Sequence, residues 1–151
     1  MITLKTLLYE GLLRGMNNTL ASGAIDAVLS KMSDLNNGNA VEQGIELLRQ
    51  STDNETSISN PLDIKKLNPM DFAIVINPNN RCLIIIKKHN GSEYYIYGIE
   101  VCGYMAYKFG KFAKFNEVKK DIYGMDIANI TIKKIESKEN INICQSIISN
   151  V

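Results

Sequence analysis

Lysine and phenylalanine recur together at intervals of three residues in the second half of the chain. An aromatic ring can stack on an unpaired base and a lysine can hold a phosphate, so this composition is typical of a contact with single-stranded nucleic acid. The alternative is that the rings anchor the segment to the core while the lysines stay in water on a helix or loop face. The sequence favours this alternative because the segment has no arginine and only mild basicity. The residues concerned are Lys108, Phe109, Lys111, Phe112, Lys114 and Phe115.

Catalytic chemistry is harder to build from these residues. The single histidine, His89, and Cys82 could act as base and nucleophile, but seven residues of extended chain separate them by ~23 Å and place them on opposite faces. The common motifs for phosphate, dinucleotide, zinc-protease and serine-hydrolase chemistry are absent from the sequence. Carboxylates such as Asp71, Glu93 and Glu100 would support an enzyme only if they converged in a cleft. The sequence therefore favours a non-enzymatic protein and leaves an enzyme as an open alternative.

The composition is that of an ordinary globular domain. The chain has 151 residues, of which 45% are hydrophobic and 22% charged, so it can bury a core without metals or disulfides. Its three cysteines, Cys82, Cys102 and Cys144, lack the short spacing of a zinc or redox site, and we expect reduced thiols with no metal and no cofactor. We find no secretion signal and no apolar run of membrane-spanning length, so we expect an intracellular protein.

Charge is distributed unevenly along the chain. Residues 1–60 hold 4 basic and 7 acidic side chains, and residues 61–151 hold 13 basic and 9 acidic ones. The two parts therefore carry net charges of −3 and +4. This mild asymmetry permits an anionic partner for the C-terminal part without requiring one.

The first third of the chain shows apolar residues at helical spacing. The pattern predicts amphipathic helices over residues 3–14, 22–35 and 40–49, the last with a capping box formed by Asn39 and Glu42. These short helices need a partner for their apolar stripes.

A polar stretch separates these helices from the rest of the chain. Residues 50–60 contain almost no large apolar groups, so we expect a polar loop or linker there. Pro61 can then begin a short helical turn that ends near Leu67, before Asn68 and Pro69.

The clearest pattern is a β-meander. Three apolar segments, 72–76, 82–86 and 94–97, are joined by turn sequences and predict two successive hairpins. A two-residue type I′ turn at Asn90-Gly91 would make positions summing to 181 face each other. The expected facing pairs are Lys88 with Glu93 and Ile86 with Tyr95.

This register assigns the side chains of the meander to two faces. Because the middle strand is apolar on both faces, we expect both to be at least partly covered, one of them by the N-terminal helices. One face is expected to hold Ile84, Ile86, Tyr95 and Tyr97, and the other Leu83, Ile85, Tyr94, Ile96 and Gly98.

The last third is less clearly patterned. We expect residues 104–109 to extend the sheet, residues 116–123 to be helical and residues 130–135 to form a further strand. Residues 141–148 fit a strand or a short helix equally well. The whole chain, residues 1–151, is therefore interpreted as a single α+β domain with helices over 1–49, a polar loop or linker over 50–60 and a β-rich part over 61–151.

The segment Met1–Gly11 resembles the short amphipathic N-terminal segments on proteins of large tailed bacteriophages. In T-even-like phages such segments target internal proteins to the capsid, and a maturation protease cuts after a Leu/Ile-x-Glu motif. Leu8, Glu10 and Gly11 are similar to that processing site. The resemblance implies a phage-encoded protein. The alternative is that a leucine-rich first helix packs on the sheet, and the two are compatible.

Two functional hypotheses follow. The first is a small, non-enzymatic, phage-encoded protein that binds a phage or host protein, either packaged in the virion or acting in the bacterial host cytoplasm. The second is a single-stranded nucleic-acid-binding module that uses the lysine and phenylalanine segment. We expect no membrane association, and the sequence predicts no oligomeric state.

Overall fold

A computed structural model describes residues 29–30, 32–77, 81–125 and 127–149. The first predicted helix, over 3–14, and most of the second lie outside the described residues, as do Leu8, Glu10 and Gly11. Residues 29–30 and 32–33 are helical. In the part of the chain that the structure describes, no helix is both long and apolar enough to cross a membrane.

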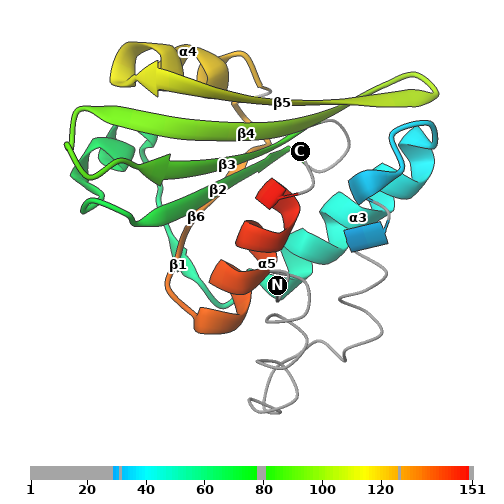
Figure 1. Cartoon of the computed structure of the whole chain (residues 1–151), viewed down its shortest axis with the longest axis horizontal. Helices are drawn as coiled ribbons and strands as arrows, with labels where there is room; N and C mark the ends of the chain where they lie inside the picture. Colours follow the sequence, from blue (N-terminus) through cyan, green and yellow to red (C-terminus); the bar gives the residue numbers. More distant parts are fainter. Residues whose placement is uncertain (1–28, 31, 78–80, 126, 150–151) are drawn as a thin grey trace.

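The described residues form an antiparallel sheet with helices on both faces (Figure 1). This arrangement confirms the predicted α+β class. In chain order the elements are α3 (Gly38–Ser51), β1 (Thr56–Ser57), the 3-10 helix η1 (Pro61–Lys66), β2 (Phe72–Asn77), β3 (Arg81–Lys87), β4 (Glu93–Cys102), β5 (Met105–Lys114), α4 (Phe115–Tyr123), β6 (Thr131–Ile135) and α5 (Lys138–Ser149).

The strand order across the sheet is β1-β6-β2-β3-β4-β5. Strands β2 to β5 form the predicted meander, extended by one strand beyond the two hairpins that the sequence indicates most clearly. Strand β6 returns from the far end of the chain to pair with β2, and the short β1 pairs with the outer side of β6. Strand β5 therefore forms one edge of the sheet and β1 the other.

Both faces of the sheet are at least partly covered, as predicted. We call the side that carries α3 and α5 the helix face, and the side that carries η1 and α4 the α4 face (Figure 1). Apolar side chains alternate between the two along each central strand. On the helix face the strands bury Phe72, Ile74, Ile76, Cys82, Ile84, Ile86 and Ile99. On the α4 face they bury Ala73, Val75, Leu83, Ile85, Tyr94, Ile96 and Ile132.

The predicted register of β3 and β4 is confirmed, but the turn between them is not the predicted one. Ile86 pairs with Tyr95, and the Lys88 backbone N–H donates to the Glu93 carbonyl at 2.9 Å. Only Gly91 in this loop has a positive φ, 72°, whereas a type I′ turn needs two such residues. The Asn90 side chain accepts hydrogen bonds from two following backbone N–H groups and stabilises a four-residue loop instead. A two-residue and a four-residue loop centred on the same bond give the same register.

The hairpin between β4 and β5 docks on the N-terminus of α3. Gly103 has a φ of 63° and precedes Tyr104 in a two-residue loop that closes with the pair Cys102 and Met105. The Gly38 N–H donates to the Tyr104 carbonyl at 2.9 Å. A Cβ at Gly38 would lie 3.1 Å from the Gly103 carbonyl oxygen, so a glycine permits this close approach.

The start of α3 differs from the prediction. Asn37, rather than Asn39, is the N-cap, and its side-chain oxygen accepts a hydrogen bond from the Ala40 N–H at 3.1 Å. The helix therefore begins two residues earlier than the capping box formed by Asn39 and Glu42 would place it.

Residues 50–60, predicted as a polar loop or linker, take part in the fold. Helix α3 continues to Ser51, and Thr56 and Ser57 pair with β6. The Glu55 carboxylate accepts hydrogen bonds from the Ser137 N–H at 3.2 Å, the Ser137 hydroxyl at 3.0 Å and the buried Asn140 amide at 3.0 Å. A polar residue of this segment, Glu55, thus makes specific hydrogen bonds to the N-terminal end of α5.

The last third of the chain resolves the remaining ambiguities. The predicted strand over 104–109 is the first half of β5, and residues 141–148 lie in α5 rather than in a strand. This segment is helical because Ile143 and Ile147, four residues apart, lie on one side of a helix, and both side chains are buried against the helix face of the sheet.

Candidate functional site

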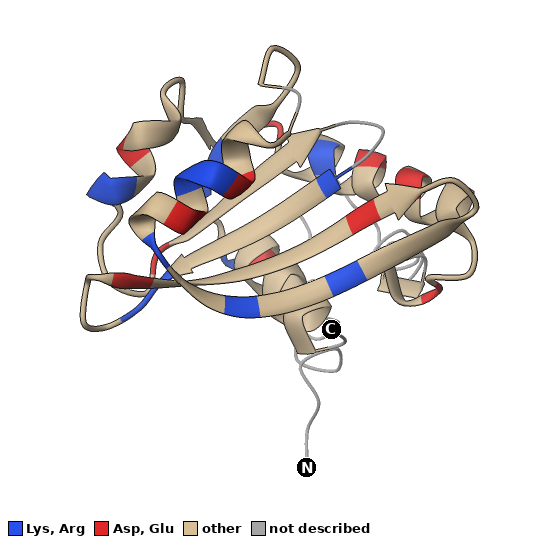
Figure 2. Cartoon of the chain, turned by 90° about the horizontal axis from the view of Figure 1, so that it is seen from above, with Lys and Arg blue, Asp and Glu red and all other residues tan. Residues whose placement is uncertain are grey.

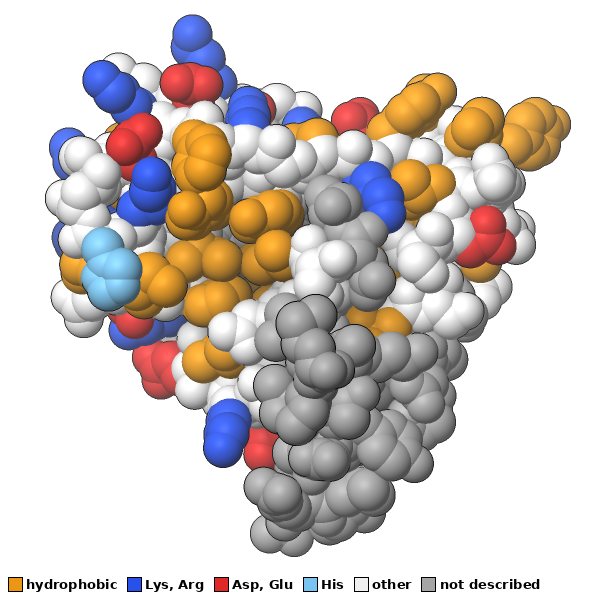
Figure 3. All heavy atoms as spheres, viewed as in Figure 1, with side chains coloured by type: hydrophobic (Ala, Val, Ile, Leu, Met, Phe, Trp, Pro, Cys, Tyr) orange, Lys and Arg blue, Asp and Glu red, His pale blue; other side chains and the backbone are white. Residues whose placement is uncertain are grey.

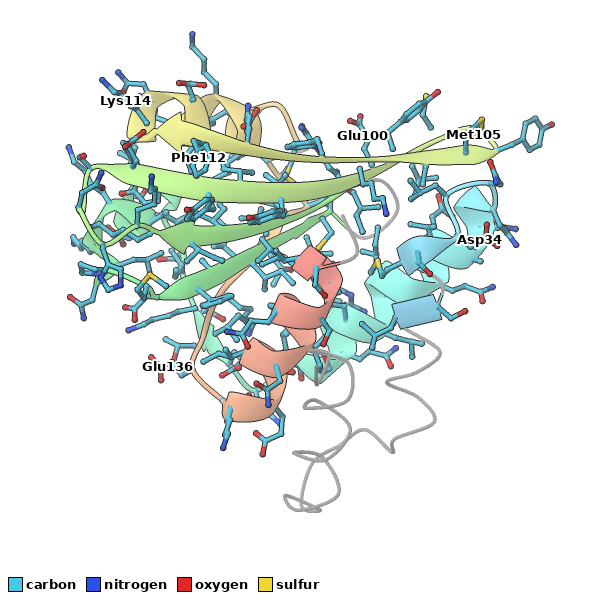
Figure 4. The ribbon with its side chains drawn as sticks, viewed as in Figure 1. Asp34, Glu100, Met105, Phe112, Lys114 and Glu136 are labelled. Atoms are coloured by element: carbon cyan, nitrogen blue, oxygen red, sulfur yellow. The ribbon has the colours of Figure 1, made fainter. Side chains whose placement is uncertain are left out.

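Among the described residues, the helices leave part of the helix face uncovered at the end near the β3-β4 loop. Figure 3 shows hydrophobic side chains gathered on this face, beside basic groups. Three aromatic residues from two neighbouring strands meet here, and we call Tyr95, Tyr97 and Phe112 the aromatic patch. Tyr95 and Tyr97 are half-buried, whereas Phe112 is 59% exposed. Phe112 projects from β5, where Figure 4 labels it.

Cross-strand pairing creates the aromatic patch. Tyr95 on β4 faces Phe112 on β5, and their ring centroids lie 4.6 Å apart at an interplanar angle of 52°. Tyr97, two residues further along the same face of β4, stacks on Tyr95 with a centroid distance of 6.2 Å and an angle of 21°. Burial, with a contribution from Tyr95, raises the pKa of Tyr97, so its hydroxyl stays protonated at neutral pH.

Lysines flank the aromatic patch on the same face of the sheet. The Lys88 ammonium lies 4.5 Å from the centroid of the Phe112 ring and 5.3 Å from that of Tyr95. Lys114 follows Phe112 by two residues and faces Glu93 across the ladder. Glu93 also lies 3.8 Å from Lys88, measured between the ammonium nitrogen and a carboxylate oxygen.

A shallow open groove of about 480 Å³ runs beside the aromatic patch. Gly110 faces Tyr97 across the ladder and contributes no side chain, so the groove is bordered by rings on one side and by Lys108 at its far end. The surface therefore presents, in successive rows, lysines, aromatic rings, a glycine and a further lysine. Such a surface can stack a planar group and neutralise an anion next to it.

The period of three in the lysine and phenylalanine segment conflicts with the period of two in a strand. Because residues 105–114 form β5, the predicted helix or loop face is wrong, and the six residues are divided between two faces. Lys108, Phe112 and Lys114 lie on the helix face, whereas Phe109 and Lys111 lie on the α4 face.

Phe109 and Lys111 have structural partners on the α4 face. The Phe109 ring lies over Gly98, and the Arg81 guanidinium lies 5.5 Å from its centroid. The Lys111 ammonium lies 2.8 Å from an Asp121 carboxylate oxygen.

Phe115 begins α4 and packs against Tyr94, with ring centroids 6.1 Å apart. The Lys65 ammonium lies 5.5 Å from the Phe115 centroid. Phe109 and Phe115 thus anchor the segment to the core, as the alternative interpretation of the sequence expects. Phe112 does not anchor the segment in this way.

The thiol and base considered in the sequence do not meet. Cys82 is buried on the helix face, and desolvation raises the pKa of its thiol to about 12. His89 is exposed in the loop after β3. A thiol that is neutral at physiological pH and shielded from solvent is a poor nucleophile.

The three carboxylates considered for catalysis also stay apart. The Asp71 carboxylate lies 3.6 Å from the Lys134 ammonium, and the Glu100 carboxylate lies 3.9 Å from the Arg81 side chain. Glu93 and Glu100 are separated by seven positions on β4, so they project from opposite faces. Each carboxylate therefore has a basic partner of its own. Within the described ranges, no group of three potential ligands could hold a metal ion.

Sequence reasoning missed three members of this surface, namely Tyr95, Tyr97 and Lys88. The β3-β4 register already placed both tyrosines on one face, but only the pairing of β5 with β4 brings Phe112 beside them.

Comparisons of the chain with protein-family models, with curated proteins and with solved structures found no match.

Proposed function

We propose that this chain is a binding protein whose aromatic patch engages single-stranded nucleic acid. The observation that carries the proposal is the exposure of Phe112 beside Tyr95 and beneath the Lys88 ammonium. A large ring left 59% exposed contributes little to the core but offers a flat surface for a base. The role is one of binding rather than catalysis, which agrees with the basic partners held by Asp71 and Glu100.

The charges beside the aromatic patch favour an anionic ligand. Lys88, Lys108 and Lys114 lie on the same face as the rings, and Glu93 is the acidic residue among them. Three phosphate contacts to a single strand predict a slope of about −2 in a plot of log K against log salt concentration. We therefore expect weak binding that depends moderately on salt.

Titration of a fluorescein-labelled deoxythymidine decamer, followed by anisotropy at several salt concentrations, tests the proposal. Phe112→Ala is expected to weaken binding about tenfold or more, because stacking contributes ~1–3 kcal/mol per base. Since the Phe112 ring is mostly exposed, its removal should leave the fold intact. Changing Lys88, Lys108 and Lys114 together to Gln should bring the salt slope close to zero.

A matched control removes lysines from the opposite face. Lys119 and Lys120 are exposed on α4, and changing both to Gln should leave the affinity within about twofold of the wild type. The proposal fails if Phe112→Ala leaves the affinity unchanged, or if the α4 control weakens binding as much as the change of Lys88, Lys108 and Lys114.

We further propose that the protein is encoded by a tailed bacteriophage and acts in the virion or in the host cytoplasm. The resemblance of Met1–Gly11 to capsid-targeting segments supports this context, with Leu8, Glu10 and Gly11 as the processing site. Mass spectrometry of purified virions should detect the chain, either intact or beginning at Gly11. Absence of both forms from virions that contain the other internal proteins would exclude packaging.

A further inference from the structure

Strand β5 ends the sheet, and in the part of the chain that the structure describes no strand pairs with its outer side. We propose that this edge accepts an extended, acidic segment of a partner protein as an additional strand. Figure 2, seen from above, shows β5 at the border of the sheet with basic residues along it. The strand contains three lysines and no carboxylate.

One hydrogen bond reveals which backbone groups of β5 point outward. The Ala106 N–H donates to the Leu35 carbonyl at 2.8 Å, although Ala106 faces Val101 in the ladder with β4. The N–H of Ala106 therefore points away from β4. Pairing runs from Met105 to Lys114 without a bulge, so the orientation alternates strictly along the strand. Gly110 and Phe112, at even spacing from Ala106, consequently direct their N–H and C=O groups outward.

The contact with Leu35 occupies only the beginning of the outer edge. Beyond it, the strand continues to Lys114, where α4 begins and turns the chain onto the α4 face. Within the described ranges, no other strand pairs with the outward groups at Gly110 and Phe112, and these groups offer donors and acceptors to an incoming strand.

The side chains beside this edge define the partner. Residues with outward backbone groups place their side chains on the helix face, where Phe112 lies between Lys108 and Lys114. A strand laid along β5 would bring carboxylates next to these lysines if the two acidic residues were six positions apart. An apolar residue next to Phe112 and a bulky one next to Gly110 would complete the contact. Lys111, on the other face, already has Asp121 as its partner.

A second copy of the chain is a poor occupant of the same edge. Antiparallel pairing of two β5 strands would bring together six lysines with no acidic residue on either strand. Lysines on an edge strand are a common protection against such self-pairing. The same lysines that repel a second β5 would attract an acidic strand from another protein, and they would therefore make this edge selective for acidic partners.

The probe for the experiment is an acetylated and amidated heptapeptide, Glu-Thr-Leu-Thr-Phe-Thr-Glu, added to the full chain. Hydrogen exchange followed by NMR should show the amide protons of Gly110 and Phe112 exchanging about tenfold more slowly at saturating peptide. The matched control peptide, Lys-Thr-Leu-Thr-Phe-Thr-Lys, should give no protection, because it repels Lys108 and Lys114.

A pair of substitutions at Gly110 separates edge pairing from other modes of binding. Gly110→Pro removes an outward N–H without removing a hydrogen bond to β4, and the positive-φ residues of the described chain do not include Gly110. It should abolish peptide binding, whereas Gly110→Ala, which keeps the N–H, should retain it. If Gly110→Pro does not fold, a peptide N-methylated at its Leu and Phe provides the second test and should not bind.

Several outcomes would overturn the inference. They are unchanged exchange at Gly110 and Phe112, equal binding of the basic peptide, full binding by Gly110→Pro, and protection of the same amides by self-association without peptide. Edge pairing is tested by N-methylation of the peptide, which leaves the chain unchanged, whereas decamer binding is tested by Phe112→Ala, which keeps the outward backbone groups of β5. Failure of edge pairing and failure of nucleic-acid binding are therefore distinguishable.

Discussion

The ring of Phe109 on β5 lies directly over Gly98 on β4. A Cβ at Gly98 would lie 2.4 Å from two atoms of that ring and 3.0 Å from a methyl group of Leu83. Gly98 is therefore the place where the edge strand is held against the sheet by an aromatic side chain from its neighbour.

We predict that Gly98→Ala destabilises the protein by about 1–3 kcal/mol, the usual cost of overpacking a well-filled site. The added methyl group must displace the Phe109 ring, which also contacts the Arg81 guanidinium. Urea denaturation measures the change in the free energy of unfolding.

A double-mutant cycle provides the control for Gly98. In a Phe109→Ala background the clash with the ring is gone and only the contact with Leu83 remains, so Gly98→Ala should cost less than it does in the wild-type background. Equal costs in the two backgrounds would show that the ring and the glycine are not coupled.

Glu55 should contribute more to stability than its position in a polar segment indicates. Its carboxylate accepts hydrogen bonds from the Ser137 N–H and hydroxyl and from the Asn140 side chain, which is only 8% exposed. Glu55→Ala is expected to lower the free energy of unfolding by about 1–2 kcal/mol, as for the loss of a helix cap. The control is Glu136→Ala, because Glu136 is exposed and its carboxylate pairs with Lys134 at the surface, and it should cost less than about 0.5 kcal/mol. Similar costs for both changes would contradict this role for Glu55.

The three thiols should differ sharply in reactivity. Cys102 is exposed at the end of β4, whereas Cys82 and Cys144 are buried and desolvation raises the pKa of both. Iodoacetamide at pH 8 should therefore alkylate one thiol in the native protein and all three in urea. Peptide mapping identifies the site, and native labelling of Cys82 at the rate of Cys102 would contradict the burial of Cys82.

Stability should fall in alkaline solution. Cys82 and Cys144 are held neutral in the folded state, so their contribution is fully present below the unfolded thiol pKa of about 8.5 and is lost as the pH rises toward the folded value. For Cys82 that window extends to about pH 12. Between pH 8 and 9.5 we expect a loss of about 1 kcal/mol per thiol, measured by urea denaturation.

The corresponding control removes the titrating groups. A variant with Cys82→Ala and Cys144→Ala will be less stable at every pH, because the changes leave cavities. Its free energy of unfolding should nevertheless vary less between pH 8 and 9.5 than that of the wild type. An identical pH dependence would assign the alkaline loss to other groups.

Local pattern determined much of this fold. Alternation of side chains in β3 and β4, together with the loop at Asn90, was enough to predict that Ile86 faces Tyr95, because a hairpin register depends on residues close in sequence. Helical spacing likewise predicted α3 and α4 to within one or two residues. The polar composition of residues 50–60 predicted a loop and gave no sign that Glu55 binds the start of α5, since its partners lie more than eighty positions away.

Tertiary structure alone decided what the lysine and phenylalanine segment can do. The sequence established which residues are present, but their three-residue period fits no single strand face. The pairing of β5 with β4 places Phe112 on the exposed part of the helix face and Phe109 over Gly98 on the other face. Which part of a face stays uncovered, and which strand becomes an edge, depends on where distant helices pack. Composition near a site does not encode those non-local contacts, and so the aromatic patch and the outer edge of β5 emerge only in the folded chain.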